Sequence, residues 1–101
     1  MSSLPKYHIS FESRVDLLEI WTSVLEASGS LSTADKVLDV IKDSFETLGH
    51  NPGIGHSRED LTDEGLKFWS VYRYLIVYDP RSEPIDIIRV IHGARDLENL
   101  L

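Results

Sequence analysis

Apolar and polar positions follow two different periods along the chain, and the changes of period divide it into elements. Residues 7–11 alternate aromatic or apolar side chains with polar ones, which is typical of a half-buried β-strand. From residue 12 the apolar positions recur every three or four residues, which predicts an amphipathic helix that ends at Gly29. Ser10 or Ser13 is expected to cap its start. The expected apolar stripe is Leu17, Leu18, Trp21, Val24, Leu25 and Ser28, with Glu19, Thr22 and Glu26 opposite.

A second helix follows at once, with a more regular stripe. Its apolar positions are Ala34, Val37, Leu38, Ile41, Phe45 and Leu48. Residues 32–35, Ser-Thr-Ala-Asp, have the pattern of a helix start, and Gly49 and Pro52 bracket the end. Two amphipathic helices joined by so short a loop must lie antiparallel, so the sequence predicts a helical hairpin.

Strand chemistry returns in the second half of the chain. Residues 66–71, 73–78 and 85–92 are rich in β-branched and aromatic side chains, and the two prolines of residues 79–84 indicate a turn. Short turns between successive strands favour an antiparallel meander. The predicted fold class is therefore α+β, with an N-terminal strand, an antiparallel helical hairpin and a three-stranded antiparallel meander in one domain, residues 1–101.

The last strand is apolar on both faces. Simple alternation places Ile85, Ile87, Arg89 and Ile91 on one face and Asp86, Ile88, Val90 and His92 on the other. A helical hairpin covers only one face of a sheet, so something else should cover the second. The candidates are the C-terminal residues Leu97, Leu100 and Leu101, a second copy of the chain, or a different protein.

Composition narrows the classes of function. The chain has 101 residues, no cysteine and a formal charge of −7. A disulfide scaffold and thiolate metal sites are excluded, and a general nucleic-acid binder is disfavoured. The short apolar runs and the N-terminus predict neither a membrane span nor a secretory signal, so we expect a soluble, cytoplasmic protein. His50 and His56 have no defined third ligand, so neither a metal nor a cofactor is expected.

The negative charge is concentrated in the predicted helical hairpin. Residues 12–46 hold eight acidic and three basic side chains, whereas residues 65–95 hold five basic and three acidic ones. The sheet side is therefore mildly basic. This distribution favours a protein partner but leaves room for a modest phosphate contact at the sheet.

Several segments in sequence order resemble a known family. They are Asp16-Leu17-Leu18-Glu19-Ile20-Trp21, the stripe from Ile41 to Leu48, Pro52-Gly53-Ile54-Gly55, Arg58-Glu59-Asp60-Leu61, Gly65-Leu66-Lys67, Arg73-Tyr74-Leu75-Ile76-Val77-Tyr78 and Ile88-Arg89-Val90-Ile91-His92-Gly93-Ala94-Arg95-Asp96-Leu97. Together they are similar to the ParE branch of the ParE/RelE toxin superfamily. The last segment, ten residues long, is the most specific.

The resemblance implies the toxin of a bacterial type II toxin–antitoxin module, of the kind also called a plasmid stabilisation protein. ParE-like toxins poison DNA gyrase, and a cognate antitoxin neutralises them in a hetero-oligomer by filling a groove beside the sheet. Residues expected to line such a groove are Trp69, Tyr74, Tyr78, Ile87, Arg89 and Ile91.

Two alternatives stay open on the same fold. RelE-like relatives are ribosome-dependent messenger-RNA endonucleases, and the candidate residues for that chemistry are Lys67, Arg73, Arg89, His92 and Arg95. Arg89 and His92 are three apart on a strand and so should point to opposite faces, which weakens them as a pair. We instead expect Arg89 and Arg95 to be structural, pairing with acids such as Asp96 or holding the C-terminal residues. An inactive interaction module is the other alternative.

Overall fold

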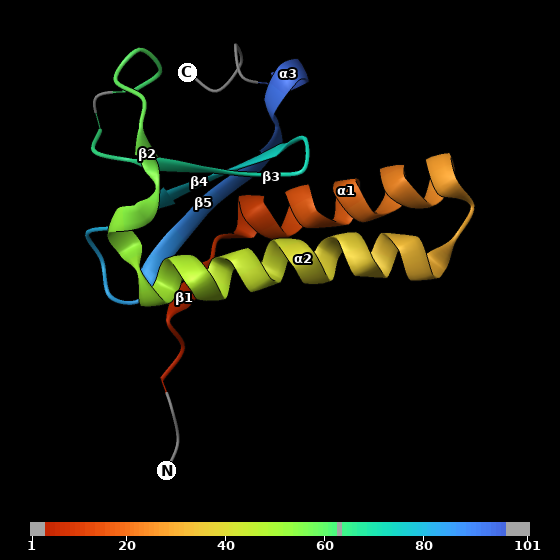
Figure 1. Cartoon of the computed structure of the whole chain (residues 1–101), viewed down its shortest axis with the longest axis horizontal. Helices are drawn as coiled ribbons and strands as arrows, with labels where there is room; N and C mark the ends of the chain where they lie inside the picture. Colours follow the sequence, from red (N-terminus) through yellow and green to blue (C-terminus); the bar gives the residue numbers. More distant parts are fainter. Residues whose placement is uncertain (1–3, 63, 97–101) are drawn as a thin grey trace.

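The computed structural model describes residues 4–62 and 64–96 (Figure 1). Its helices and strands follow in the order β1 (Tyr7–Ile9), α1 (Phe11–Ser28), α2 (Leu31–His50), the 3₁₀ turn η1 (Pro52–Ile54), β2 (His56–Ser57), β3 (Lys67–Val71), β4 (Tyr74–Asp79), β5 (Ile85–His92) and α3 (Gly93–Asp96). No helix in this described part is long and apolar enough to cross a membrane.

The strands form one mixed sheet over the described ranges, in the order β1-β5-β4-β3-β2. The three strands of the predicted meander, β3, β4 and β5, pair antiparallel. The N-terminal strand β1 pairs parallel with β5 through the registers Tyr7–Ile85 and Ile9–Ile87. The predicted α+β class is confirmed. The parallel position of β1 and the short strand β2 were not predicted, because β1 meets β5 only through contacts across the length of the chain.

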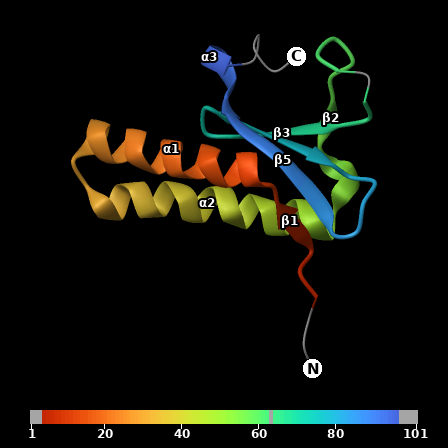
Figure 2. The same cartoon turned by 180° about the vertical axis from the view of Figure 1, so that it is seen from behind.

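The two helices lie side by side and antiparallel on one face of the sheet (Figures 1 and 2). Ser10 caps α1 by accepting a hydrogen bond from the Ser13 N–H, and Gly29 ends it in the left-handed conformation with φ of 67°. The N-cap of α2 is Ser30, which accepts a bond from the Thr33 N–H. The prediction of Ser32 was therefore wrong by two residues, because a sequence rich in serine offers several equivalent caps.

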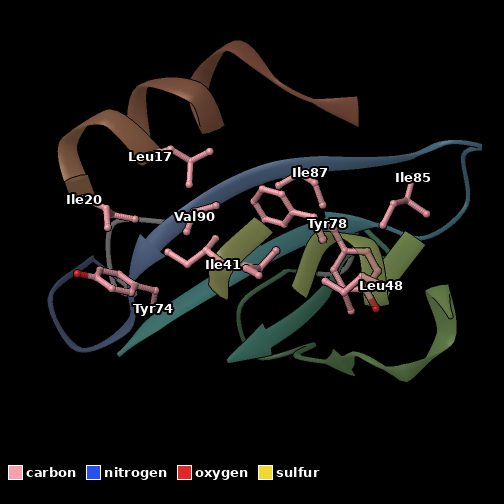
Figure 3. Packing of buried hydrophobic residues seen from close by; sticks show 11 residues of the cluster. Leu17, Ile20, Ile41, Leu48, Tyr74, Tyr78, Ile85, Ile87 and Val90 are labelled. Atoms are coloured by element: carbon pink, nitrogen blue, oxygen red, sulfur yellow. The ribbon is translucent and has the colours of Figure 1, made fainter. Parts of the chain in front are cut away.

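The core lies between the helical hairpin and the sheet (Figure 3). From α2 it takes the predicted residues Ile41, Phe45 and Leu48, all fully buried. From α1 it takes Leu17 and Ile20. The strands contribute Tyr74, Ile76, Tyr78, Ile85, Ile87 and Val90.

The expected stripe of α1 was only partly right. Leu18 was assigned to the buried side, but the structure leaves 64% of it exposed, whereas Ile20 is 7% exposed. The reason is that α1 carries apolar residues on two sides, and the sequence pattern alone did not show which side meets the sheet. Polar Ser13 and Asp16 accompany Leu17 and Ile20 on the buried side.

A β-bulge changes the faces of the last strand. Tyr78 pairs with Ile87 but Val77 pairs with Arg89, so Ile88 has no partner on β4. Consequently Ile87 and Val90 both pack in the core beneath the helices. The simple alternation that placed Ile87, Arg89 and Ile91 on one face was wrong, because one extra residue in a strand exchanges the faces of everything after it.

The sheet face away from the helices is also apolar. Phe68, Val77 and Ile91 alternate in register with core residues and are at most 3% exposed. The residues that the sequence offered as a cover, Leu97, Leu100 and Leu101, lie outside the described part of the chain. What covers this face thus stays a prediction.

Candidate functional site

The site forms where β5 continues beyond the end of β1. Because residues 4–62 and 64–96 place no neighbouring strand on that side, the backbone of β5 needs other hydrogen-bond partners. Side chains of α1 supply them. The Ser10 hydroxyl donates to the Ile88 carbonyl at 2.9 Å, and the Ser13 hydroxyl donates to the Ile87 carbonyl at 2.9 Å. The first turn of α1 therefore holds the bulge of β5 in place.

One turn further along α1, Asp16 continues this role and adds a charge. Its carboxylate accepts a hydrogen bond from the Val90 N–H at 2.9 Å and a bidentate pair from the Arg89 guanidinium at 2.8 and 2.9 Å. The Asp16 side chain is only 8% exposed, whereas that of Arg89 is 41% exposed. The hydrogen bonds to Asp16 raise the pKa of Arg89 above its usual value. Arg89 is thus held by α1 at the rim of the sheet.

A small hollow opens beside this ion pair. Its cavity volume is about 180 Å³, and its walls come from α1, β4, β5 and α3. Arg89, His92 and Arg95 all line it. Arg89 and His92 share the hollow although they are three positions apart on the strand and were expected to point to opposite faces. They meet because the Arg89 side chain turns over the edge of β5 toward Asp16. The remaining lining residues are Asp16, Glu19, Ile20, Ser23, Tyr74, Val90 and Asp96.

The second guanidinium of this hollow is paired as well. Arg95 donates two hydrogen bonds to Asp96, at 3.0 and 3.2 Å, and these bonds hold the pKa of the Asp96 carboxyl below its usual range. The His92 ring accepts a bond from the Arg95 N–H at 3.3 Å and contacts the edge of Tyr74 with ring centroids 5.9 Å apart. The prediction that Arg95 pairs with Asp96 is confirmed. Arg89 also pairs with an acid, but its partner is Asp16 and not Asp96.

A second, more apolar hollow adjoins the first. Its cavity volume is about 610 Å³, and it lies between the helices and the β3–β4 turn. Ser23 and Tyr74 line both hollows, so the two adjoin, and together they are called the continuous groove. Val24, Ala27 and Val37 form its helical wall. The groove exists because the helices, about 27 and 30 Å long at 1.5 Å per residue, extend past the sheet (Figure 1).

The β3–β4 turn closes this groove with a strained residue. Tyr72 has a left-handed φ of 55° and is 62% exposed. Its neighbour Arg73 also lines the apolar hollow. A bulky side chain in this conformation is uncommon and costs energy, and such strain is concentrated at functional sites. The positive φ of Tyr72 was not predictable from the sequence, because a turn of Tyr and Arg lacks the usual Gly or Asn.

The ribonuclease candidates do not come together as a set. Arg89, His92 and Arg95 share the polar hollow and Arg73 lines the apolar one. Lys67 lies at the start of β3, where its ammonium donates to the Ser57 hydroxyl at 3.4 Å. Asp16, Glu19 and Asp96 were not named as site residues. Asp16 and Ser13 had one usable signal, which is that they are polar positions on an otherwise apolar stripe.

The six residues expected to line an antitoxin groove lie at different depths. Tyr78 and Ile87 are fully buried in the core, and Ile91 is 3% exposed on the other face of the sheet. The Tyr78 hydroxyl instead fixes the loop before β2, accepting from the Gly55 N–H and donating to the Pro52 carbonyl. Tyr74 and Arg89 line the groove. Trp69 is half-buried and stacks on His56, with ring centroids 6.3 Å apart.

Comparison with known proteins identifies the family. The family model described as the ParE toxin of type II toxin–antitoxin systems, parDE, matches residues 7–97. The chain belongs to the ParE toxin family. It is 30% identical over 82 residues to Toxin ParE3 of Caulobacter vibrioides, a match that covers 81% of this chain and 80% of that relative.

A solved structure has the same fold. It is described as the chromosomal ParDE TA system from P. aeruginosa and superposes with a TM-score of 0.73 at 16% identity. The likeness covers 85% of this chain and 92% of that one. The fold predicted from the ParE resemblance is thereby confirmed. The chain is a ParE toxin of a type II toxin–antitoxin system.

Proposed function

We propose that this ParE toxin inhibits DNA gyrase by binding it, without covalent chemistry of its own, and that a cognate antitoxin neutralises it. The gyrase target comes from the family. The binding mechanism is supported by one observation, which is that both guanidiniums of the polar hollow, Arg89 and Arg95, are paired with carboxylates.

Pairing matters because a ribonuclease must stabilise added negative charge at the scissile phosphate. Arg89 and Arg95 are opposed in the hollow by Asp16, Asp96 and Glu19. A phosphate entering there would meet three carboxylates and two guanidiniums already engaged in hydrogen bonds. The hollow is therefore better suited to a peptide that brings both polar and apolar groups than to a phosphodiester.

We further propose that the antitoxin occupies the continuous groove. An extended or helical segment can place apolar side chains against Val24, Ala27 and Val37 and polar groups against the Asp16–Arg89 pair. Among the residues expected to contact the antitoxin, Arg89 and Trp69 offer exposed atoms, and Tyr74 forms the wall shared by both hollows. Tyr78, Ile87 and Ile91 would support the surface from within.

Two assays run in parallel test the target. The purified toxin is added to a gyrase supercoiling reaction and to a cell-free translation reaction. We expect loss of supercoiling with full-length messenger RNA in the translation reaction. Antitoxin encoded by the adjacent reading frame should restore supercoiling when it is mixed with the toxin beforehand.

Other outcomes would contradict the proposal. Truncated messages with unaffected supercoiling would instead establish a messenger-RNA endonuclease. A folded toxin that acts in neither reaction would indicate an inactive interaction module. The toxin variant Val37→Asp tests whether the antitoxin restores supercoiling by binding the groove, because this change puts a charge into the helical wall of the groove. It should weaken the antitoxin's effect, whereas Asp39→Asn on the exposed side of α2 should not.

A further inference from the structure

The outward side of α1 carries an apolar row that the core does not use. Phe11 is 75% exposed, Val15 39% and Leu18 64%. With Thr22 and the half-buried Leu25, these positions are spaced four, three, four and three residues apart. This is the spacing of a coiled-coil seam, in which every apolar position faces a partner helix.

The seam lies opposite the buried side of α1. Residues turn by about 100° each along a helix, so Ile20 points in a direction roughly opposite to Phe11 and Leu18. The sheet and α2 both pack against α1 (Figure 1). The apolar positions of the seam do not line the groove proposed for the antitoxin, which uses Ser23, Val24 and Ala27 of the inner side.

A row of carboxylates runs along one flank of the seam. Glu12, Glu19 and Glu26 are spaced by seven residues, and all three are exposed. In heptad terms they occupy the e positions, beside the apolar core of a coiled coil, where charges select the partner. The other flank carries Arg14 and the half-buried Trp21, whose indole N–H donates to Asp35 of α2 at 2.9 Å. The seam is thus apolar with one strongly acidic border.

We propose that the outward seam of α1 docks an amphipathic helix of another protein that carries lysine or arginine beside its apolar residues. Such a helix buries Phe11, Val15 and Leu18 and faces each of the three glutamates with a cation. This proposal rests on the pattern of α1 and holds whether or not gyrase is the target.

Charge disfavours the other occupants. In an antiparallel pair of copies, e positions face e positions, so the glutamate rows would repel each other. A parallel pair of copies would place Arg14 opposite Glu19 but leave Glu12 and Glu26 without a cation. An anionic membrane surface would repel the acidic border. A basic helix alone satisfies the whole row.

Designed peptides test the proposal directly. Three fluorescein-labelled helices of about 21 residues, three heptads each, are titrated against the full chain by anisotropy. One has leucine at the seam positions and lysine at the flanks, the second has leucine and glutamate, and the third has serine and lysine. We expect binding of the first only, weakening as salt rises from 50 to 500 mM by screening.

Variants of the toxin locate the surface. Leu18→Ser should weaken binding of the leucine–lysine peptide about tenfold or more, whereas Leu31→Ser, at a residue 60% exposed on α2, should not. The triple change Glu12→Gln, Glu19→Gln and Glu26→Gln should weaken it about three- to tenfold at low salt. The matched triple change at exposed Asp39, Asp43 and Glu46 of α2 should have little effect. Circular dichroism confirms that each variant is folded.

Three results would overturn the proposal. Equal binding of the serine–lysine peptide would mean that only net charge is recognised. Equal loss in Leu18→Ser and Leu31→Ser would place the surface elsewhere. Concentration-dependent dimerisation that Leu18→Ser abolishes, measured by analytical ultracentrifugation, would make a second copy the occupant. None of these depends on the supercoiling assay, so the two proposals fail independently.

Discussion

Asp16 is the residue on which the geometry of the site depends most. It is a nearly buried carboxylate, and its partners are a guanidinium and a backbone N–H on a strand more than 70 residues away. A buried charge is tolerated only when it is paired and hydrogen-bonded. Asp16 thereby connects the first helix to the last strand, at the point where β5 extends beyond its pairing with β1.

Replacing Arg89 with Ala should destabilise the fold. The change leaves the Asp16 carboxylate buried with one backbone donor, so we expect a loss of about 1–3 kcal/mol in the free energy of unfolding. Part of the effect is screened because the Arg89 side chain is 41% exposed. Urea unfolding measures it, and Asp16→Asn combined with Arg89→Gln should cost less than the sum of the single changes.

The matched control is Arg81→Ala. Arg81 also makes a bidentate pair, with Asp79, but its side chain is 63% exposed, so the loss in the free energy of unfolding should be clearly smaller than for Arg89→Ala. If Arg89→Ala abolished toxicity and left the urea midpoint unchanged, Arg89 would contact the target instead of supporting the fold.

At the scale of elements, the β3–β4 turn combines strain with exposure. Tyr72 holds a left-handed φ of 55° and yet is 62% exposed, so its side chain contributes little burial to offset the strain. Strain of this kind persists where a partner or substrate benefits from the fixed conformation. The turn borders the apolar hollow, which fits a role for Tyr72 in contacting the antitoxin.

Tyr72→Gly should therefore stabilise the free toxin. Glycine adopts a positive φ without the steric cost, so the free energy of unfolding should rise by about 0.5–1 kcal/mol. Arg73→Gly, at a residue with an ordinary negative φ, should instead lower it by a similar amount through the flexibility of glycine. Thermal unfolding of both variants checks the pair. A lower midpoint for Tyr72→Gly would mean that the tyrosine ring contributes packing that outweighs the strain.

The elements themselves were largely predictable because their signals are local. Serine and glycine caps, a regular stripe on α2 and β-branched runs in β3, β4 and β5 act within a few residues of one another. The buried side of α1 and the bulge at Ile88 were not predictable from the sequence, because each depends on the residues of other elements that pack against it. The site was also predicted only in part, since Arg89, His92 and Arg95 were named but Asp16, the carboxylate that pairs with Arg89, was not.

For the whole molecule, acid should be the most revealing perturbation. Asp79 accepts hydrogen bonds from Arg81, and Asp96 accepts them from Arg95. These bonds lower the pKa values of both carboxyl groups below the usual range. A carboxyl with a depressed pKa in the folded state contributes stability that is present above its unfolded pKa of about 3.9. That stability is lost as the pH falls through the lower pKa of the folded state.

Asp79→Asn should therefore lower stability at pH 7 by about 0.5–1 kcal/mol, and the difference from the unmodified chain should shrink as the pH falls below the unfolded pKa of about 3.9. Urea unfolding between pH 7 and pH 2.5 measures the two curves. Glu83→Gln, at an exposed acid of the same loop, is the control and should give a curve parallel to that of the unmodified chain. Curves for Asp79→Asn that stay separate in acid would show that the aspartate acts through packing and not through its charge.

The sequence by itself determined the α+β class, the helical hairpin, the meander and the ParE family, because periodicity, caps and closing motif are all properties of neighbouring residues. Only the tertiary structure decided which side of α1 is buried, which residues of β5 face the helices and which carboxylate holds Arg89. These depend on one inserted residue at Ile88 and on contacts between segments some 70 residues apart. A local sequence pattern predicts neither the inserted residue nor the long-range contacts. A helix with two apolar sides and a strand with two apolar faces are each compatible with more than one packing partner.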